Sequence, residues 1–172
     1  MQHYNYIFTG GGLAALLTLY HFLEDPFLKD SSILIIDQEI KNSNDRTWCF
    51  WDSSSLFDKQ AEKIWLKAWF KDNTHTQQML LHPYRYKKLT SSTFYQFIYN
   101  LAKQHPNVHF AHQKVIDVTE LGTHCTVKTN IQLYTCNRVF NSIYNPDWVA
   151  SQTKFPLVQQ HFIGWVVQTK EA

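Results

Sequence analysis

Tyr4-Asn5-Tyr6-Ile7-Phe8-Thr9-Gly10-Gly11-Gly12-Leu13-Ala14-Ala15 opens the chain, and Ser32-Ile33-Leu34-Ile35-Ile36-Asp37 follows after a helical run. Together they predict a strand, a glycine turn, a helix and a second strand that ends in a carboxylate. The glycines follow the G-x-G-x-x-G/A pattern of a dinucleotide-binding βαβ unit. The sequence therefore favours an α/β fold built around this unit.

Four residues of the unit are predicted to hold the adenosine diphosphate half of a dinucleotide. Gly10 permits the tight turn, Gly12 lets a pyrophosphate approach the backbone, and Ala15 keeps the helix close to the sheet. The free N–H groups and the dipole of the helix N-terminus then face the phosphates. Asp37 ends the second strand, where a carboxylate accepts both hydroxyl protons of a ribose.

The surroundings of the glycine turn support this interpretation. Asp37 lies 27 residues after Gly10, more than the usual roughly 20, and a longer connection from helix to strand absorbs the excess. The chemistry does not separate FAD from NAD, but a fingerprint within the first ten residues is more typical of FAD proteins. Glu24-Asp25-Pro26 ends the helix. Its apolar residues recur at helical spacing: Leu13, Leu16, Leu17, Tyr20 and Leu23.

A polar stretch, Gln38–Arg46, follows the second strand and has the composition of a surface loop. It leads directly into the aromatic stretch Thr47–Asp52. An arginine beside packed aromatics is a candidate for a phosphate or flavin contact, and the competing interpretation is an arginine on a solvated loop. Arg46 is therefore a further candidate for cofactor binding, outside the βαβ unit.

Further strands are predicted at 64–72 and 76–82, joined by a polar turn. The segment Tyr84–Leu89 alternates aromatic and basic residues, which on a strand places Arg85 and Lys87 on one face. One interpretation is a solvated basic face, and the other places the segment across the mouth of a flavin site.

The rest of the chain returns to the core and then changes character. Ser91-Ser92 is predicted to cap a helix that buries Phe94, Phe97, Ile98 and Leu101. Short strands follow as far as residues 138–141. We therefore predict a Rossmann-like domain over residues 1–144 with inserted strands at about 62–90. Residues 145–172 are predicted to form a linker and the first strand of a substrate domain, at 160–169.

The composition and the residue spacing argue against several other classes of protein. The 172 residues are 44% hydrophobic with a net charge of +2, enough for a core and without a basic stripe for nucleic acid. Three separated cysteines favour a reducing, cytoplasmic compartment over a disulfide framework or zinc site.

The opening strand leaves no room for a signal peptide, and no apolar run could span a membrane; peripheral membrane contact stays open. His109 and His112 would point to opposite faces of a strand, so no metal site is predicted.

With these residues in view, the chain resembles the N-terminal part of a lycopene cyclase of the bacterial and plant flavoprotein type. Four segments carry the resemblance, which runs from Tyr4 to about Thr169: Tyr6–Ala14, Asn42–Trp51, Pro83–Tyr86 and Gln160–Trp165. The Arg-Thr-Trp-Cys-Phe-Trp and His-Phe-x-Gly-Trp stretches are far more specific than the glycine turn. Ala15 stands where the family usually has glycine.

The resemblance implies an FAD/NAD(P)-binding fold of the aromatic hydroxylase and glutathione reductase type. It implies that FAD is held at Gly10, Gly12, Ala15, Asp37 and Arg46, with a backbone contact from Val115 to adenine. The implied reaction closes the linear ends of lycopene into ionone rings. Acid starts it, reduced FAD serves as a non-redox cofactor and NADPH is the electron donor.

The resemblance also sets expectations for the chain itself. The family's catalytic acids are expected beyond residue 172, so no catalytic residue is named, and the chain is expected to hold FAD weakly and not to cyclise lycopene. The expected partners are a lipophilic carotenoid and a membrane surface. An exposed strand carrying Phe162, Trp165 and Val167 favours a homodimer.

Two alternatives remain open. A related flavin hydroxylase would carry Asp-Gly-x-x-Ser-x-x-Arg after residues 139–141, where this chain has Ser142-Ile143-Tyr144-Asn145-Pro146. A non-catalytic nucleotide-binding domain, complete at this length, is the second. A finished domain would not leave the apolar strand at 160–169 unpaired.

Overall fold

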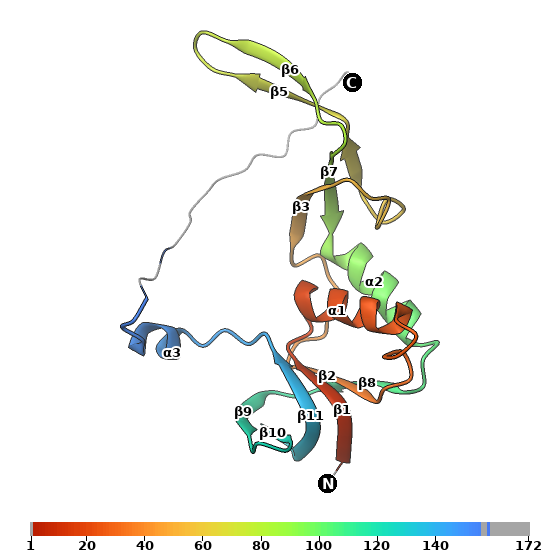
Figure 1. Ribbon diagram of the computed structural model, residues 1–172, viewed down its shortest axis with the longest axis vertical. Coiled ribbons are helices and arrows are strands. Elements are labelled where there is room, and N and C mark those ends of the chain that lie inside the picture. Colours follow the sequence, from red (N-terminus) through yellow and green to blue (C-terminus); the bar gives the residue numbers. More distant parts are fainter. Residues whose placement is uncertain (1, 156–157, 159–172) are drawn as a thin grey trace. The chain divides into compact units, whose positions relative to one another are not determined.

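The computed structural model describes residues 2–155 and 158 and divides into two compact units, Met1–Ser142 and Ile143–Ala172 (Figure 1). The first unit contains the described strands and both longer helices. In the second unit, α3 (Pro146–Ser151) is a short helix that the sequence did not predict. The strand predicted at 160–169 lies outside the described residues.

A six-stranded sheet forms the centre of the first unit, in the order β8-β2-β1-β11-β10-β9. The first four strands run parallel, and the pairs β11–β10 and β10–β9 are antiparallel. Sequentially distant strands thus meet, since β1 lies between β2 and β11. The strand bounds are β1 (Gln2–Thr9), β2 (Ile33–Asp37), β8 (Val108–His112), β9 (Val115–Glu120), β10 (Cys125–Thr129) and β11 (Leu133–Asn141).

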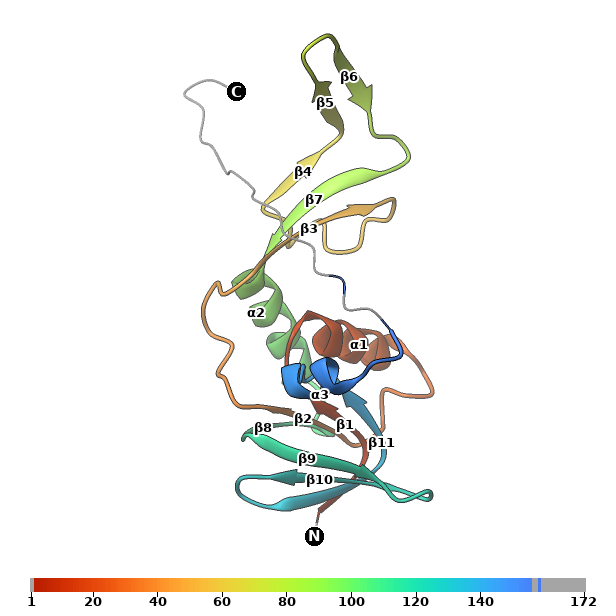
Figure 2. The ribbon, with the colours of Figure 1, turned by 90° about the vertical axis from the view of Figure 1, so that its left-hand side faces the viewer.

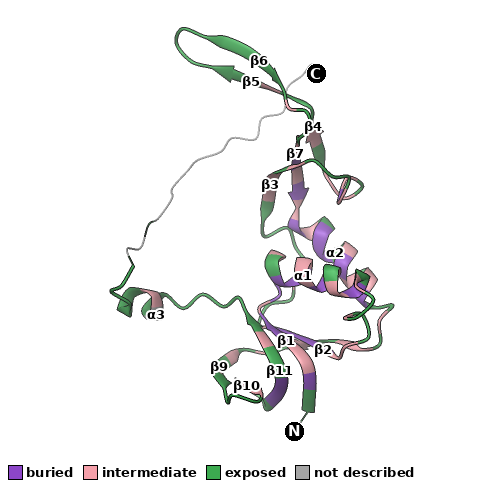
Figure 3. Cartoon of the chain, viewed as in Figure 1, coloured by how far each residue is buried: buried purple, intermediate pink, exposed green. Residues whose placement is uncertain are grey.

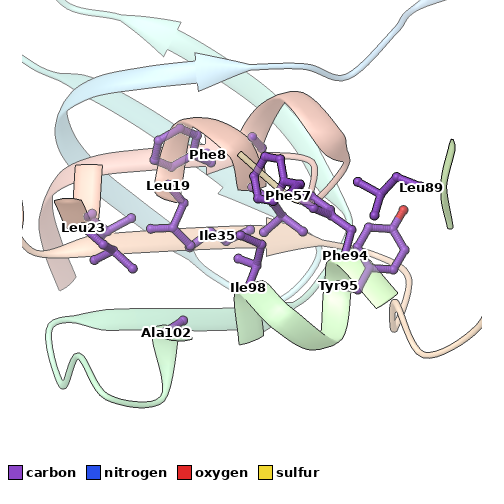
Figure 4. Close-up of a cluster of buried hydrophobic side chains, with 13 residues drawn as sticks. Phe8, Leu19, Leu23, Ile35, Phe57, Leu89, Phe94, Tyr95, Ile98 and Ala102 are labelled. Atoms are coloured by element: carbon purple, nitrogen blue, oxygen red, sulfur yellow. The ribbon is translucent and has the colours of Figure 1, made fainter. Parts of the chain in front are cut away.

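Two helices pack against one face of this sheet. In α1 (Leu13–Glu24) the side chains of Leu16 and Leu19 are fully buried, and in α2 (Ser91–Ala102) those of Phe94 and Ile98 are. They meet Phe8 and Ile35 of the sheet in one apolar cluster (Figure 4). The predicted helix end at Glu24-Asp25 is confirmed. Among the described residues, no helix combines the length and apolar character needed to cross a membrane.

On the opposite face, the strands β9 and β10 of the same sheet pack over β2. Leu34 and Ile36 of β2 share a second buried cluster with Val127 of β10, and Val115 and Val118 of β9 pack against it. Because β2 and β9 are far apart in the strand order, this contact requires the sheet to curl strongly, as Figure 2 shows. The first four residues of β2, Ile33–Ile36, are consequently buried on both faces of the sheet.

The start of α2 differs from the sequence-based prediction. Thr90 is the N-cap residue, and no side chain caps the helix. The Ser91 hydroxyl, predicted to cap, is buried: it donates to Asp45 Oδ1 at 2.8 Å and accepts the Arg46 N–H at 3.0 Å. The prediction was wrong because this hydroxyl instead ties the preceding loop to the helix.

The inserted segment forms two small sheets (Figure 2). One has the order β3-β7-β4, and the other is the hairpin β5-β6, whose β6 is exposed throughout (Figure 3). The strand predicted at 64–72 is divided at Leu66 into β4 and β5. The bounds are β3 (Thr47–Asp52), β4 (Lys63–Trp65), β5 (Lys67–Lys71), β6 (Thr76–Leu80) and β7 (Arg85–Thr90).

The basic residues of β7 are not solvated, which corrects the first interpretation of this segment. Lys87 is completely buried, and its ammonium group donates to Asp52 Oδ2 at 2.7 Å. Arg85 donates to Asp58 Oδ2 at 2.6 Å. The alternation of residues was predicted correctly, but the carboxylates that make burial of a lysine favourable come from the end of β3 and the loop after it, which periodicity does not reveal.

Candidate functional site

The glycine turn joins β1 to α1 in the geometry that the fingerprint predicts. Gly10 has a φ of +97°, a conformation that favours glycine, and an added Cβ would lie 2.5 Å from Ser142 Oγ. Its N–H donates to the Ile36 carbonyl at 2.7 Å, which ties the turn to β2. Gly10 is thus required by the protein's own backbone.

Gly12 has a different reason to be glycine. It is the N-cap residue of α1, has an ordinary φ of −80°, and an added Cβ would meet no protein atom within 4 Å. Neither backbone strain nor packing therefore demands glycine at this position. The space in front of the helix N-terminus is open, as close approach of a phosphate requires.

Gly11 is a site residue that the sequence reasoning missed. Its N–H donates to Asp37 Oδ2 at 2.6 Å, and an added Cβ would lie 3.2 Å from the same oxygen. The consecutive run of three glycines was the available signal, since the fingerprint itself requires only the first and third. Asp37 Oδ1 accepts the Glu39 N–H at 2.8 Å, so backbone N–H groups hold both carboxylate oxygens at the end of β2.

A pocket of about 350 Å³ adjoins this carboxylate. It lies where β2 and β8 end and α2 passes, and its wall combines the acidic and glycine residues with apolar and aromatic ones. Tyr99 and Phe110 meet edge to face, with ring centroids 5.1 Å apart, and Phe110 is 46% exposed. The lining residues used below are Gly11, Asp37, Ile40, Lys41, Tyr99 and Phe110.

The charged groups of the pocket are held by one another. Lys41 Nζ lies 2.8 Å from Glu39 and 3.4 Å from Asp45. Burial alone would lower the pKa of Lys41, but the hydrogen bond that its ammonium group donates to Glu39 and the nearby Asp37 carboxylate outweigh burial and raise the pKa. Burial, with a smaller contribution from Asp37, raises the pKa of Tyr99. Lys41 therefore stays a cation and Tyr99 a neutral phenol across the physiological range.

Of the six predicted cofactor-binding residues, Asp37 alone lines the pocket. Gly10 and Gly12 flank the lining residue Gly11, and the other three lie elsewhere. Ala15 is buried between α1 and the sheet, as its predicted spacing role requires. Arg46 is exposed and its guanidinium donates to the Asp45 carbonyl, while Val115 begins β9 and packs against the second cluster. The roles of Arg46 and Val115 in holding a cofactor stay predictions.

No metal centre is formed by the residues from 2 to 155, where no three His, Cys, Asp or Glu side chains gather. His109 packs edge to face on Tyr4, with ring centroids 5.7 Å apart. His112 lines the pocket instead.

The pocket, together with the open space at Gly12 next to its lining residue Gly11, suits the adenosine diphosphate portion of a dinucleotide. The open space at Gly12 suits the pyrophosphate, and the Asp37 carboxylate is an acceptor for ribose hydroxyls. The aromatic and aliphatic wall of Phe110, Tyr99 and Ile40 suits a flat base. Sequence reasoning proposed the phosphate and ribose ends, and these roles stay predictions. It missed the wall for the base, because these residues come from α2, β8 and a loop.

Solved structures resemble this fold. They include p-nitrophenol 4-monooxygenase PnpA from Pseudomonas putida DLL-E4 (TM-score 0.60, 16% identity, 82% of this chain and 41% of that one). A second is pqsL, "a probable FAD-dependent monooxygenase" from Pseudomonas aeruginosa (TM-score 0.62, 8% identity, 80% of this chain and 42% of that one). A third is the flavin-dependent brominase Bmp2 (TM-score 0.60, 15% identity, 81% of this chain and 38% of that one). At these identities the likeness shows the fold alone, and the chain spans about two fifths of each relative's length.

Fold and pocket together define the class: an α/β protein with a Rossmann-like, FAD-binding fold, as predicted. The family model described as "Lycopene cyclase protein" matches residues 5–172. The chain belongs to the lycopene cyclase family, which confirms the predicted resemblance. No curated protein matches the chain.

Proposed function

We propose that the chain is the FAD-binding part of a lycopene β-cyclase, which converts the linear ends of lycopene to ionone rings. The observation that carries the FAD site is the glycine at position 12, whose absent side chain leaves a space that no protein atom fills. The family match supports the carotenoid substrate. NADPH as electron donor and peripheral membrane contact belong to the same proposal.

The chain's residues would hold the adenosine diphosphate half in three places. N–H groups at the start of α1 would bind the pyrophosphate, Asp37 would accept the ribose hydroxyls, and Phe110 would contact the adenine. Reduced FAD, when bound, supplies negative charge that balances a cationic transition state without net redox change. We assign no catalytic acid to the described residues.

The pocket has a direct test in adenine binding. Phe110→Ala should weaken AMP binding about tenfold, since loss of a base–aromatic contact costs roughly 1–3 kcal/mol. Phe110 is half exposed, so stability should change little. Phe27→Ala removes an aromatic side chain that is 89% exposed and outside the pocket, and it should bind AMP like the wild type. Equal AMP affinity in all three proteins, measured by NMR titration, would show that adenine does not use this wall.

The 172-residue chain should hold FAD weakly and form no β-carotene. The proposed contacts are mainly to the adenosine diphosphate half, so flavin should be lost during purification. Absorbance near the flavin bands and pigment extraction after incubation with lycopene, FAD and NADPH are the measurements. Stoichiometric FAD on the purified chain, or ring formation by it, would contradict this expectation.

A further inference from the structure

We propose that one face of the inserted sheet β3-β7-β4 binds the conjugated polyene chain of the substrate through a row of three aromatic rings. The row consists of Trp51, Tyr86 and Trp65, one residue from each strand, and we call it the aromatic row. This inference rests on the proposed function for the identity of the ligand. The contact surface itself is read from the register of the strands.

The register places the three rings in line. Tyr86 pairs with Trp51 on one side and with Trp65 on the other. The ring centroids of Trp51 and Tyr86 are 4.7 Å apart, and those of Trp65 and Tyr86 are 5.8 Å apart. The rings tilt by 41° and 36°, so they form a shallow continuous strip across the strands.

The fold directs this strip outward. Successive residues of a strand alternate between faces, and Lys87 is buried on the opposite face against Asp52. Trp51 is 56% exposed and Trp65 36% exposed. Large apolar side chains gathered on an exposed surface indicate a binding partner.

The charges beside the aromatic row favour an uncharged partner. The neighbouring row on the same face holds Lys63 and Lys88, and Lys88 Nζ lies 2.9 Å from Glu62. The aromatic row itself carries no ionised group, because burial and the Cys49 thiol raise the pKa of Tyr86 above its ordinary value. An uncharged strip with charges along one side complements an uncharged rod such as a polyene, whose polarisable π-system packs on aromatic faces.

A bilayer is the competing partner, and the open edges of the inserted sheets make it the weaker choice. In the neighbouring hairpin β5-β6 the polar turn 72–75 joins the two strands, which among the described residues pair with each other alone. Unpaired strand edges and a polar turn are costly in hydrocarbon. The polyene requires only the ring faces, so we commit to it.

The test uses the full chain with lycopene in non-ionic detergent micelles. Lycopene is achiral, so a circular dichroism band in its visible absorption arises only when a chiral site binds it. The variant W51L/W65L should weaken the apparent affinity in this titration about tenfold, and W51L alone should have a smaller effect. W69L is the matched control, because Trp69 is 65% exposed but lies on the hairpin β5-β6.

The outcomes separate this inference from the proposed flavin site. Bands in the wild type and W69L that weaken in W51L/W65L support the aromatic row. No band in the wild type, equal bands in all variants, or adhesion to lycopene-free phosphatidylcholine vesicles that depends on Trp51 and Trp65 would overturn it. ADP titration of the same proteins reports on the flavin site: an unchanged response confirms that the variants are folded, and a wild type without response contradicts the flavin proposal instead.

Discussion

Lys87→Met is expected to lower the free energy of unfolding of the first unit by about 3 kcal/mol, because removal of one partner from a buried ion pair leaves the other uncompensated. The Lys87 ammonium group donates to Asp52 Oδ2 at 2.7 Å, to the Leu56 carbonyl at 2.8 Å and to the Ser54 carbonyl at 2.9 Å. It also lies 2.8 Å from the buried oxygen Asp58 Oδ1.

The lysine also fixes the loop that carries Phe57. This residue has a φ of +61°, and its ring packs on Phe94 and Phe97 of α2. Without the two hydrogen bonds to the loop carbonyls of Ser54 and Leu56, Phe57 loses its position in the core. Methionine retains the apolar stem of lysine, so the variant isolates the charge and its bonds.

The adjacent residue provides the control. Lys88 forms one ion pair, with Glu62, whose side chain is 49% exposed, so Lys88→Met should cost less than about 1 kcal/mol. Urea unfolding followed by tryptophan fluorescence measures both. If Lys87→Met were no more destabilising than Lys88→Met, the buried cluster would have no role in stability.

The same cluster predicts that the free energy of unfolding falls in acid. Partial burial by itself raises the pKa of Asp52, but hydrogen bonds from Lys87 and Ser54 outweigh it and lower the pKa to about 2, from 3.8. The unfolded state therefore binds more protons between these two values. Stability from Asp52 is complete above pH 3.8 and is lost as the pH falls toward 2. The loss in this window should be smaller in Lys87→Met, and an identical loss would exclude Asp52 as its source.

Gly10→Ala is the second large change, with an expected destabilisation of about 3 kcal/mol. Part of the cost is the φ of +97°, which an L side chain rarely adopts. The rest is the approach of the new methyl group to Ser142 Oγ, which donates to the Thr9 carbonyl at 2.8 Å and would have to move.

A double variant separates these two contributions. In a Ser142→Ala background the close contact is absent, so Gly10→Ala should cost about 2 kcal/mol, which is the backbone strain alone. Urea unfolding of the four proteins of this cycle gives the coupling. Full additivity would mean that Ser142 does not restrict position 10.

The sequence predicted the βαβ unit well because its information is local. The turn at Gly10, the helix from Leu13 and the carboxylate at Asp37 follow from spacing and residue type, and the structure places them as expected. The inserted strands after residue 62 were also recognised, although the single strand predicted at 64–72 is two strands, β4 and β5, and β3 was not predicted as a strand. These features depend on neighbours along the chain.

The parts that were missed depend on distant partners. The burial of Lys87 follows from carboxylates some thirty residues earlier. The wall at Phe110 and Tyr99 forms only when β8 and α2 meet beside β2. The Ser91 hydroxyl binds the Asn44–Arg46 loop instead of capping its helix. Periodicity indicates which face of an element is apolar, but it does not indicate which groups the fold brings against the polar positions.

The central claim is that the glycine turn receives the pyrophosphate of a dinucleotide, and an ADP titration of the isotope-labelled chain followed by amide NMR tests it most directly. We expect shifts at Gly10, Gly11 and Gly12 and at Asp37 in the wild type. Gly12→Ala should fold with nearly unchanged stability, since its methyl group meets no protein atom, yet bind ADP at least about tenfold more weakly. If ADP shifts none of these amides, or binds Gly12→Ala as well as the wild type, the claim is contradicted.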